Sequence, residues 1–193
     1  MDSMSCDPGT AAEKRAWRAR LREQRAALGK TEREAAARAL SELVAGLDLG
    51  ARVAAYVPVG AEPGSLAMLD AIGGEVLLPV TPATPGALDW SVYRGELAAG
   101  PFGLLEPPGQ RLGADALTSV DTVLLPAVGV SRSGVRLGRG AGYYDRSLRS
   151  GARLIAVVYD HELVDELPAE PTDVPVHAAL TPSGLIELSR NCS

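Results

Sequence analysis

The chain has 193 residues, of which 46% are hydrophobic and 22% charged, and its formal net charge is −5 at pH 7. This composition is typical of one globular domain, and its acidity argues against nonspecific binding to nucleic acid. No apolar run approaches the roughly 18 residues of a membrane-spanning helix. From the acidity and the missing apolar run together, we expect neither a nucleic-acid nor a membrane partner.

The first ten residues are predicted to form a disordered leader, because they carry acids before any base and lack an apolar segment, unlike a secretory signal. Cys6 and Cys192 are far apart in the sequence and form no CxxC motif, which is typical of reduced thiols in a cytoplasmic protein. No sequence feature announces an interface, so we expect a cytoplasmic monomer.

Two helices are predicted next. Residues 11–28 are rich in strong helix formers and place apolar residues at helical spacing. Thr31 and Glu34 have the spacing of a capping box that opens a second helix, which is expected to reach about residue 46.

Short apolar runs then alternate with helical segments. The predicted strands cover 51–59, 75–80, 88–95, 121–128 and 153–160, followed by two short strands around a Pro-Ser-Gly turn in the tail. Helices are predicted over 65–72 and from Tyr143 onward, and a Pro- and Gly-rich loop over 98–113. This order predicts a single α/β domain over 11–188, with a central, mostly parallel sheet flanked by helices and an N-terminal helical arm.

The segment GVRLGRGAGYYDRSL, residues 134–148, joins a predicted strand to a predicted helix. Such a loop can direct backbone N–H groups and a helix N-terminus at a phosphate, and Arg136 and Arg139 can add bidentate contacts. It is neither a Walker A loop nor a dinucleotide fingerprint. From spacing alone, a tight structural turn remains an alternative.

This segment closely resembles the signature GxRLGRGxGYYDRxL of the 5-formyltetrahydrofolate cyclo-ligase family. Further matches occur in the same order along residues 11–182: Lys14 with Arg18, Tyr56-x-Pro58-x-x-x-Glu62, GLLEP over 103–107, and Leu167, Pro168, Asp173, Leu180 and Thr181. The resemblance implies an α/β fold and an ATP-dependent closure of 5-formyltetrahydrofolate to 5,10-methenyltetrahydrofolate, with release of ADP and phosphate. In the family mechanism, the formyl oxygen is phosphorylated before N10 attacks.

The resemblance also implies the site residues. The residues expected to bind ATP are Lys14, Arg18, Arg136, Leu137, Gly138, Arg139, Gly140, Ala141, Gly142, Tyr143 and Tyr144. Those expected to bind the folate are Val57, Glu62, Arg139, Gly140, Ala141, Gly142 and Tyr143. Arg139 and Tyr143 would be catalytic, and Asp145 and Asp173 would bind Mg²⁺. Taken singly, Lys14 with Arg18 also suits a solvated helix face, and Glu62 a surface acid.

The sequence departs from the family pattern at three places. Ser131 stands where an aspartate is frequent, which predicts a weaker anchor for the loop; Thr172 replaces a histidine, and Ala141 a glycine.

Two alternative functions stay open: a non-catalytic nucleotide-binding relative, and a cyclo-ligase for a different formamide-like substrate. A phosphosugar isomerase would need an acid–base carboxylate opposite the loop, for which no motif is present.

Overall fold

The computed structural model describes residues 8–82, 86–140, 142–148 and 151–189, without the side chains of Pro8, Phe102, Asp145 and Arg146. The first seven residues of the predicted leader, both cysteines and Ala141 lie outside the described residues. Within the described residues, no helix combines the length and the hydropathy that crossing a membrane requires.

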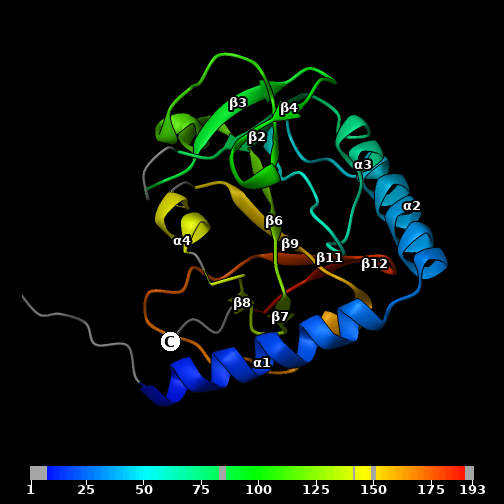
Figure 1. Cartoon of the computed structure of the whole chain (residues 1–193), viewed down its shortest axis with the longest axis vertical. Helices are drawn as coiled ribbons and strands as arrows, with labels where there is room; N and C mark the ends of the chain where they lie inside the picture. Colours follow the sequence, from blue (N-terminus) through cyan, green and yellow to red (C-terminus); the bar gives the residue numbers. More distant parts are fainter. Residues whose placement is uncertain (1–7, 83–85, 141, 149–150, 190–193) are drawn as a thin grey trace, which may run out of the picture.

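The chain alternates helices and strands along most of its length (Figure 1). The helices are α1 (Pro8–Ala27), α2 (Lys30–Gly46), α3 (Leu66–Asp70) and α4 (Tyr143–Ser147), with short 3₁₀ helices at Pro101–Gly103, Ala114–Ser119 and Asp160–Glu162. The strands are β1 (Arg52–Ala54), β2 (Glu75–Val80), β3 (Asp89–Tyr93), β4 (Ala98–Ala99), β5 (Leu105–Glu106), β6 (Thr122–Pro126), β7 (Gly129–Ser131), β8 (Arg136–Leu137), β9 (Arg153–Val157), β10 (Leu163–Val164), β11 (Ala178–Thr181) and β12 (Gly184–Glu187).

The main sheet has the strand order β12-β11-β9-β6-β1-β2-β3. Its inner strands from β11 to β2 run parallel, and the edge strands β12 and β3 are antiparallel to their neighbours. This confirms the predicted α/β fold with a mostly parallel sheet. Since β2 lies on one side of β1 and β6 on the other, β1 and β6 form a topological switch point, where open α/β sheets bind ligands.

Apolar side chains cover both faces of the sheet, as the near-continuous hydrophobic strands require. Val53 and Leu78 pack on one face with residues of α2 and α3, whereas Ala54 and Leu77 face the opposite cluster. Trp90 is fully buried in that second cluster and belongs to the core.

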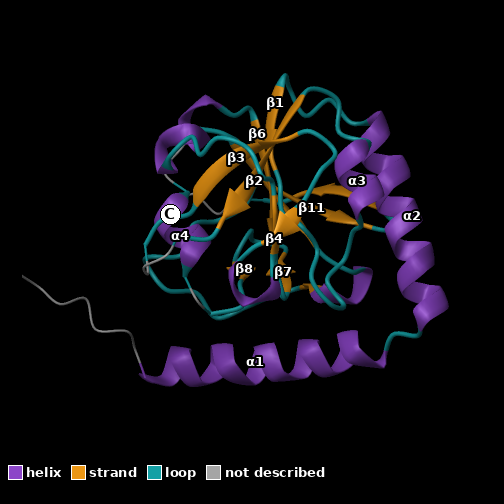
Figure 2. Ribbon diagram, turned by 45° about the horizontal axis from the view of Figure 1, so that its top comes forward, coloured by secondary structure: helices purple, strands orange, loops and turns teal. Residues whose placement is uncertain are grey.

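The long helix α1 lies apart from the main sheet and runs along one end of the molecule (Figures 1 and 2). Its buried Leu21 packs with Val128 and Leu137 near the small sheet β10-β7-β8. The contact requires glycine at 129, because a Cβ there would lie 2.6 Å from the Leu21 side chain.

Several local predictions were wrong: α1 begins at Pro8 within the predicted leader, and the predicted loop over 98–113 contains β4 and β5. Strand β1 ends at Ala54 rather than at residue 59, and Pro58, which has no N–H to donate, lies in the segment that leaves the sheet. The predicted capping box is displaced, because α2 starts at Lys30 and the Glu32 carboxylate accepts from the Gly29 N–H at 2.8 Å. The expected loop after β6 contains the β7–β8 hairpin.

Candidate active site

A cavity of about 790 Å³ lies where β1 and β6 end. It is lined by segments that follow these strands, by α1, by the 136–144 segment and by residues of the late loop, which is the connection 165–177 between β10 and β11. The lining residues are Lys14, Arg18, Tyr56, Val57, Val59, Glu62, Pro79, Thr81, Leu88, Leu104, Leu105, Glu106, Pro126, Arg136, Leu137, Gly138, Arg139, Gly140, Gly142, Tyr143, Tyr144, Glu170, Thr172 and Asp173. The fold thus places the cavity at its switch point.

Lys14 reaches the cavity from α1 and forms ion pairs with two carboxylates of the late loop. Its Nζ lies 2.6 Å from Oε2 of Glu170 and 2.7 Å from Oδ2 of Asp173. Burial lowers the pKa of Lys14, but the hydrogen bonds that its ammonium donates to Asp173 and Glu170 outweigh this effect and raise its pKa overall. The ammonium therefore stays charged at the cavity wall.

Two glycines shape the 136–144 segment. A Cβ on Gly138 would lie 2.9 Å from Nη1 of the buried Arg136, and Gly140 has a φ of +105°. The Arg18 Nε donates to the Gly138 carbonyl at 2.9 Å, while Arg136 lies over the Tyr144 ring. The segment is thereby held from outside by Arg18 of α1 and from within by its own Arg136.

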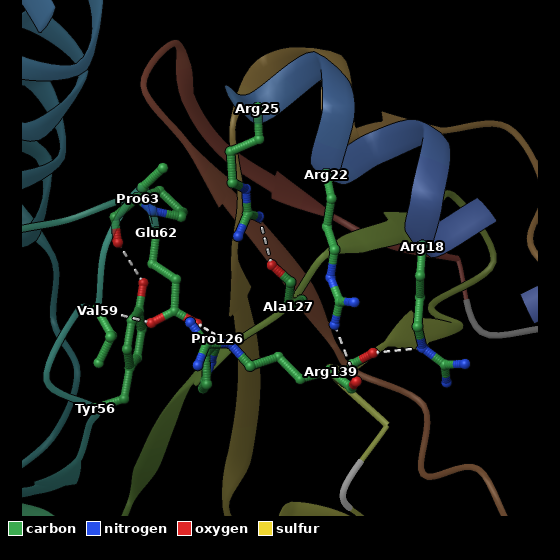
Figure 3. Close-up of polar contacts among 12 residues, drawn as sticks. Arg18, Arg22, Arg25, Tyr56, Val59, Glu62, Pro63, Pro126, Ala127 and Arg139 are labelled. Carbon is green, nitrogen blue, oxygen red and sulfur yellow. Dashed lines mark hydrogen bonds and ion pairs between the residues drawn. The ribbon is translucent and has the colours of Figure 1, made fainter. Parts of the chain in front are cut away.

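Glu62 and Arg139 join the two halves of the cavity (Figure 3). The Arg139 Nε lies 2.9 Å from Oε1 of Glu62, and Oε2 of Glu62 accepts from the Val59 N–H at 2.9 Å. The Glu62 side chain is only 6% exposed, whereas that of Arg139 is 50% exposed. A buried carboxylate after β1 is thus paired with a half-exposed cation of the glycine-rich segment.

Replacing Glu62 with glutamine is expected to stabilise the fold at neutral pH. Burial raises the pKa of Glu62, despite the Val59 hydrogen bond and the charge of Arg139. A raised folded-state pKa favours folding below the unfolded pKa, and this contribution is lost as pH rises through the folded pKa. Thermal denaturation should therefore give Glu62→Gln the higher Tm at pH 7 and equal values near about pH 4. A lower Tm at pH 7 would show that the Arg139 pair outweighs burial.

Two tyrosines with raised pKa values line the cavity. The Tyr56 hydroxyl donates to the Pro63 carbonyl at 2.5 Å, and burial raises its pKa well above the ordinary value. Burial and the charge of Glu62 also raise the pKa of Tyr144, so both phenols stay protonated.

Helix α4, which carries Tyr143 and Tyr144, has only five residues. Its dipole is correspondingly small, so any anion must depend on backbone N–H groups and arginines.

The carboxylates that could hold a magnesium ion lie in the late loop. Asp173 and Glu170 present oxygen atoms at the cavity wall, the ligand type that Mg²⁺ prefers together with phosphate oxygens and water. The side chain of Asp145 is not described, and the described residues contain no group of three or more potential metal ligands. The donor chemistry of Asp173 fits the predicted role, while the role of Asp145 stays a prediction.

The sequence matches one family over most of its length. Residues 10–182 match the model of the 5-formyltetrahydrofolate cyclo-ligase family. The chain belongs to this family. A 5-formyltetrahydrofolate cyclo-ligase of Mycolicibacterium smegmatis is 47% identical over 184 residues, which cover 89% of this chain and 95% of the relative. One of Escherichia coli K12 is 33% identical over 122 residues, covering 60% and 67%.

Solved structures give the same assignment. The NMR structure of Aquifex aeolicus 5,10-methenyltetrahydrofolate synthetase has a TM-score of 0.78 and 26% identity, covering 93% of this chain and 95% of that one. A synthetase from Mycoplasma pneumoniae shares the fold at a TM-score of 0.67 and 21% identity, covering 86% and 97%. With the family match and the 47% identical relative, this makes the chain an enzyme of the ligase class.

The cavity of this cyclo-ligase family member brings together nearly all of the predicted site residues. Lys14, Arg18, Val57, Glu62 and Asp173 line it, as do the described members of the 136–144 segment. Ala141 and the side chain of Asp145 lie outside the described part, and the binding and catalytic roles remain predictions.

Sequence reasoning missed several residues around the cavity. Glu170 was not singled out although it pairs with Lys14, and neither was the buried Glu106, which accepts from the Thr81 N–H at 2.7 Å. Glu106 is the glutamate of the GLLEP segment, and this match to the family was the sequence signal that could have marked it as a site residue. The Ser131 Oγ accepts from the Val135 N–H at 3.0 Å, so an anchor for the loop is present, and its weakness relative to an aspartate stays a prediction.

Proposed function

We propose that this protein closes 5-formyltetrahydrofolate to 5,10-methenyltetrahydrofolate in an ATP- and Mg²⁺-dependent reaction that releases ADP and phosphate. The observation that carries the proposal is the contact between Arg139 and Glu62 within one cavity, because it joins a phosphate-type loop to a buried carboxylate. Family membership and the 47% identical relative of that name support the same reaction. A cytoplasmic location and a monomeric state are part of the proposal.

The phosphates of ATP would bind on the basic side of the cavity. Lys14, Arg18 and Arg136 supply positive charge there, and the segment from Leu137 to Tyr144 supplies backbone N–H groups. Lys14 would then exchange part of its contact with Glu170 and Asp173 for phosphate oxygens. Charge neutralisation and positioning are the main contributions that a protein makes to phosphoryl transfer.

The pterin would bind at Glu62, next to Val57. A carboxylate accepts two hydrogen bonds side by side, which suits the adjacent N–H groups of a 2-amino-4-oxo ring. Both Glu62 oxygens have partners in the present structure, so the ring would displace Arg139 from Oε1. The displaced guanidinium would then be available to the phosphates or to the formyl oxygen.

The formyl group is a poor electrophile because its nitrogen donates electron density to the carbonyl. Transfer of the γ-phosphoryl group from ATP to the formyl oxygen would convert that oxygen into a leaving group. N10 would then attack the formyl carbon, lose its proton, and expel inorganic phosphate as the ring closes. Arg139 and Tyr143 line the cavity as the candidates for stabilising the charge that develops on the transferred group.

Magnesium would supply charge neutralisation on the phosphates when bound. Asp173, with Asp145 in the following part of the glycine-rich segment, would hold the ion. Glu170 keeps Asp173 in place, because the Glu170 N–H donates to its Oδ2 at 2.8 Å.

The direct test follows methenyltetrahydrofolate by absorbance, with purified protein, 5-formyltetrahydrofolate and Mg-ATP. Product should form over many turnovers and should disappear when ATP is omitted or Mg²⁺ is chelated. Nucleotide binding without product would contradict this substrate and direct the search to other formamide-like compounds or to a non-catalytic role.

Glu62→Gln should weaken folate binding by about 10- to 100-fold, because a charged hydrogen-bond acceptor is replaced by a neutral one. Binding of a nonhydrolysable ATP analogue should stay within about threefold of wild type. Titration calorimetry with each ligand separates the two effects, and Glu42→Gln on the exposed face of α2 is the matched control. An equal loss of both affinities would contradict the pterin role.

A further inference from the structure

Three arginines of α1 reach from one face of the helix toward the candidate active site (Figure 3). Arg18, Arg22 and Arg25 are spaced so that successive side chains lie about one helical turn apart. Each donates to a backbone carbonyl: Arg18 to Gly138 at 2.9 Å, Arg22 to Arg139 at 3.0 Å, and Arg25 to Ala127 at 2.7 Å. Through Arg18 and Arg22, the helix thus binds the main chain of the glycine-rich segment.

The first two of these bonds fix consecutive peptide groups. Among the described residues all peptide bonds are trans, so the C=O and N–H of one peptide group point in opposite directions. The Gly138 and Arg139 carbonyls point at α1, and the N–H groups of Arg139 and Gly140 therefore point away from it. Both residues line the cavity, and neither N–H has a hydrogen-bond acceptor within the described part of the chain.

Two adjacent N–H groups that face the same way form an anion-binding nest. The same peptide groups would repel a phosphate if they were turned over, because their carbonyl oxygens carry negative partial charge. The guanidinium of Arg22 holds the Arg139–Gly140 peptide in the receptive orientation, which Gly140 permits through its φ of +105°.

We propose that Arg22 is a positioning residue for nucleotide binding, which holds the Arg139–Gly140 peptide with its N–H toward a phosphate of ATP. Arg22 is exposed and touches the loop through this main-chain bond, so it acts through the loop and not on the reacting atoms. The inference rests on the proposed ATP-dependent reaction and adds a residue that the family signature in the glycine-rich segment does not contain.

The test compares Arg22→Ala and Arg22→Lys with wild type. Arg22→Ala should raise the KM for ATP and the Kd of a nonhydrolysable ATP analogue by about tenfold, and leave the KM for 5-formyltetrahydrofolate within about twofold. Its Tm should stay within about 2 °C, because the lost bond is exposed. Arg22→Lys should recover most of the nucleotide affinity, since one carbonyl needs only one donor. Arg20→Ala is the control, because Arg20 is an exposed arginine of the same helix that lies over the Trp17 ring.

Several outcomes would overturn the inference: nucleotide constants of Arg22→Ala within about threefold of wild type, equal defects in the alanine and lysine variants, or equal increases for both substrates. If wild type binds the nucleotide analogue but forms no methenyltetrahydrofolate, the proposed substrate fails while the Kd comparison still tests Arg22.

Discussion

Arg139→Ala is expected to lower the kcat of the cyclo-ligase reaction by about 10²- to 10³-fold while the fold stays intact. The guanidinium is half exposed in the cavity and would stabilise charge on the transferring phosphoryl group, a contribution of roughly 2–4 kcal/mol for a donor of this kind. Steady-state rates from the absorbance assay give the effect, and circular dichroism reports the fold. The loss should appear in kcat more than in the KM for folate.

The matched control for this variant is Arg132→Ala. Arg132 lies directly after β7 and pairs with the exposed Asp165 at 3.2 Å, and Arg132 does not line the cavity among the described residues, so its removal should leave the rate unchanged. A turnover of Arg139→Ala within about threefold of wild type would sink the assignment of residues 136–144 as the phosphate loop. Normal nucleotide affinity with lost turnover would instead place Arg139 on the formyl side of the reaction.

The main sheet could be predicted from the sequence because buried parallel strands read as short apolar runs. The run at 75–80 coincides with β2, and the tail strands β11 and β12 flank the predicted turn. Strand ends were less predictable, since the side chains that follow β1 line the cavity and are as apolar as those of the strand. Val57 and Val59 belong to this group.

The candidate site was predictable only where local spacing or the family signature marked it. The pairing of Lys14 with Glu170 joins residues 156 positions apart, and the Arg22 bond to the Arg139 carbonyl spans 117 positions. Neither pattern has a local signature, because the basic residues of α1 are indistinguishable in sequence from a solvated helix face. The tertiary fold alone selects which of them turn inward.

Helix α1 is also held by the buried pair of Arg25 and Glu162, which the sequence did not predict. The Arg25 Nε and Nη2 contact Oε1 and Oε2 of Glu162 at 2.6 and 2.7 Å, and the Glu162 side chain is fully buried. Arg25→Met should lower the free energy of unfolding by about 3–5 kcal/mol, because it leaves a carboxylate buried without its guanidinium. Chemical denaturation at pH 7 measures this loss.

The double variant Arg25→Met/Glu162→Leu separates the charge effect from a general loss of packing. Apolar replacement of a whole buried pair is often nearly neutral, so the double variant should be more stable than Arg25→Met alone. The exposed pair of Arg132 and Asp165 provides the comparison, and Arg132→Ala should cost less than about 1 kcal/mol. If the double variant is less stable than the single one, Glu162 stabilises the fold even without Arg25, and an uncompensated buried charge is then not the cause of the loss.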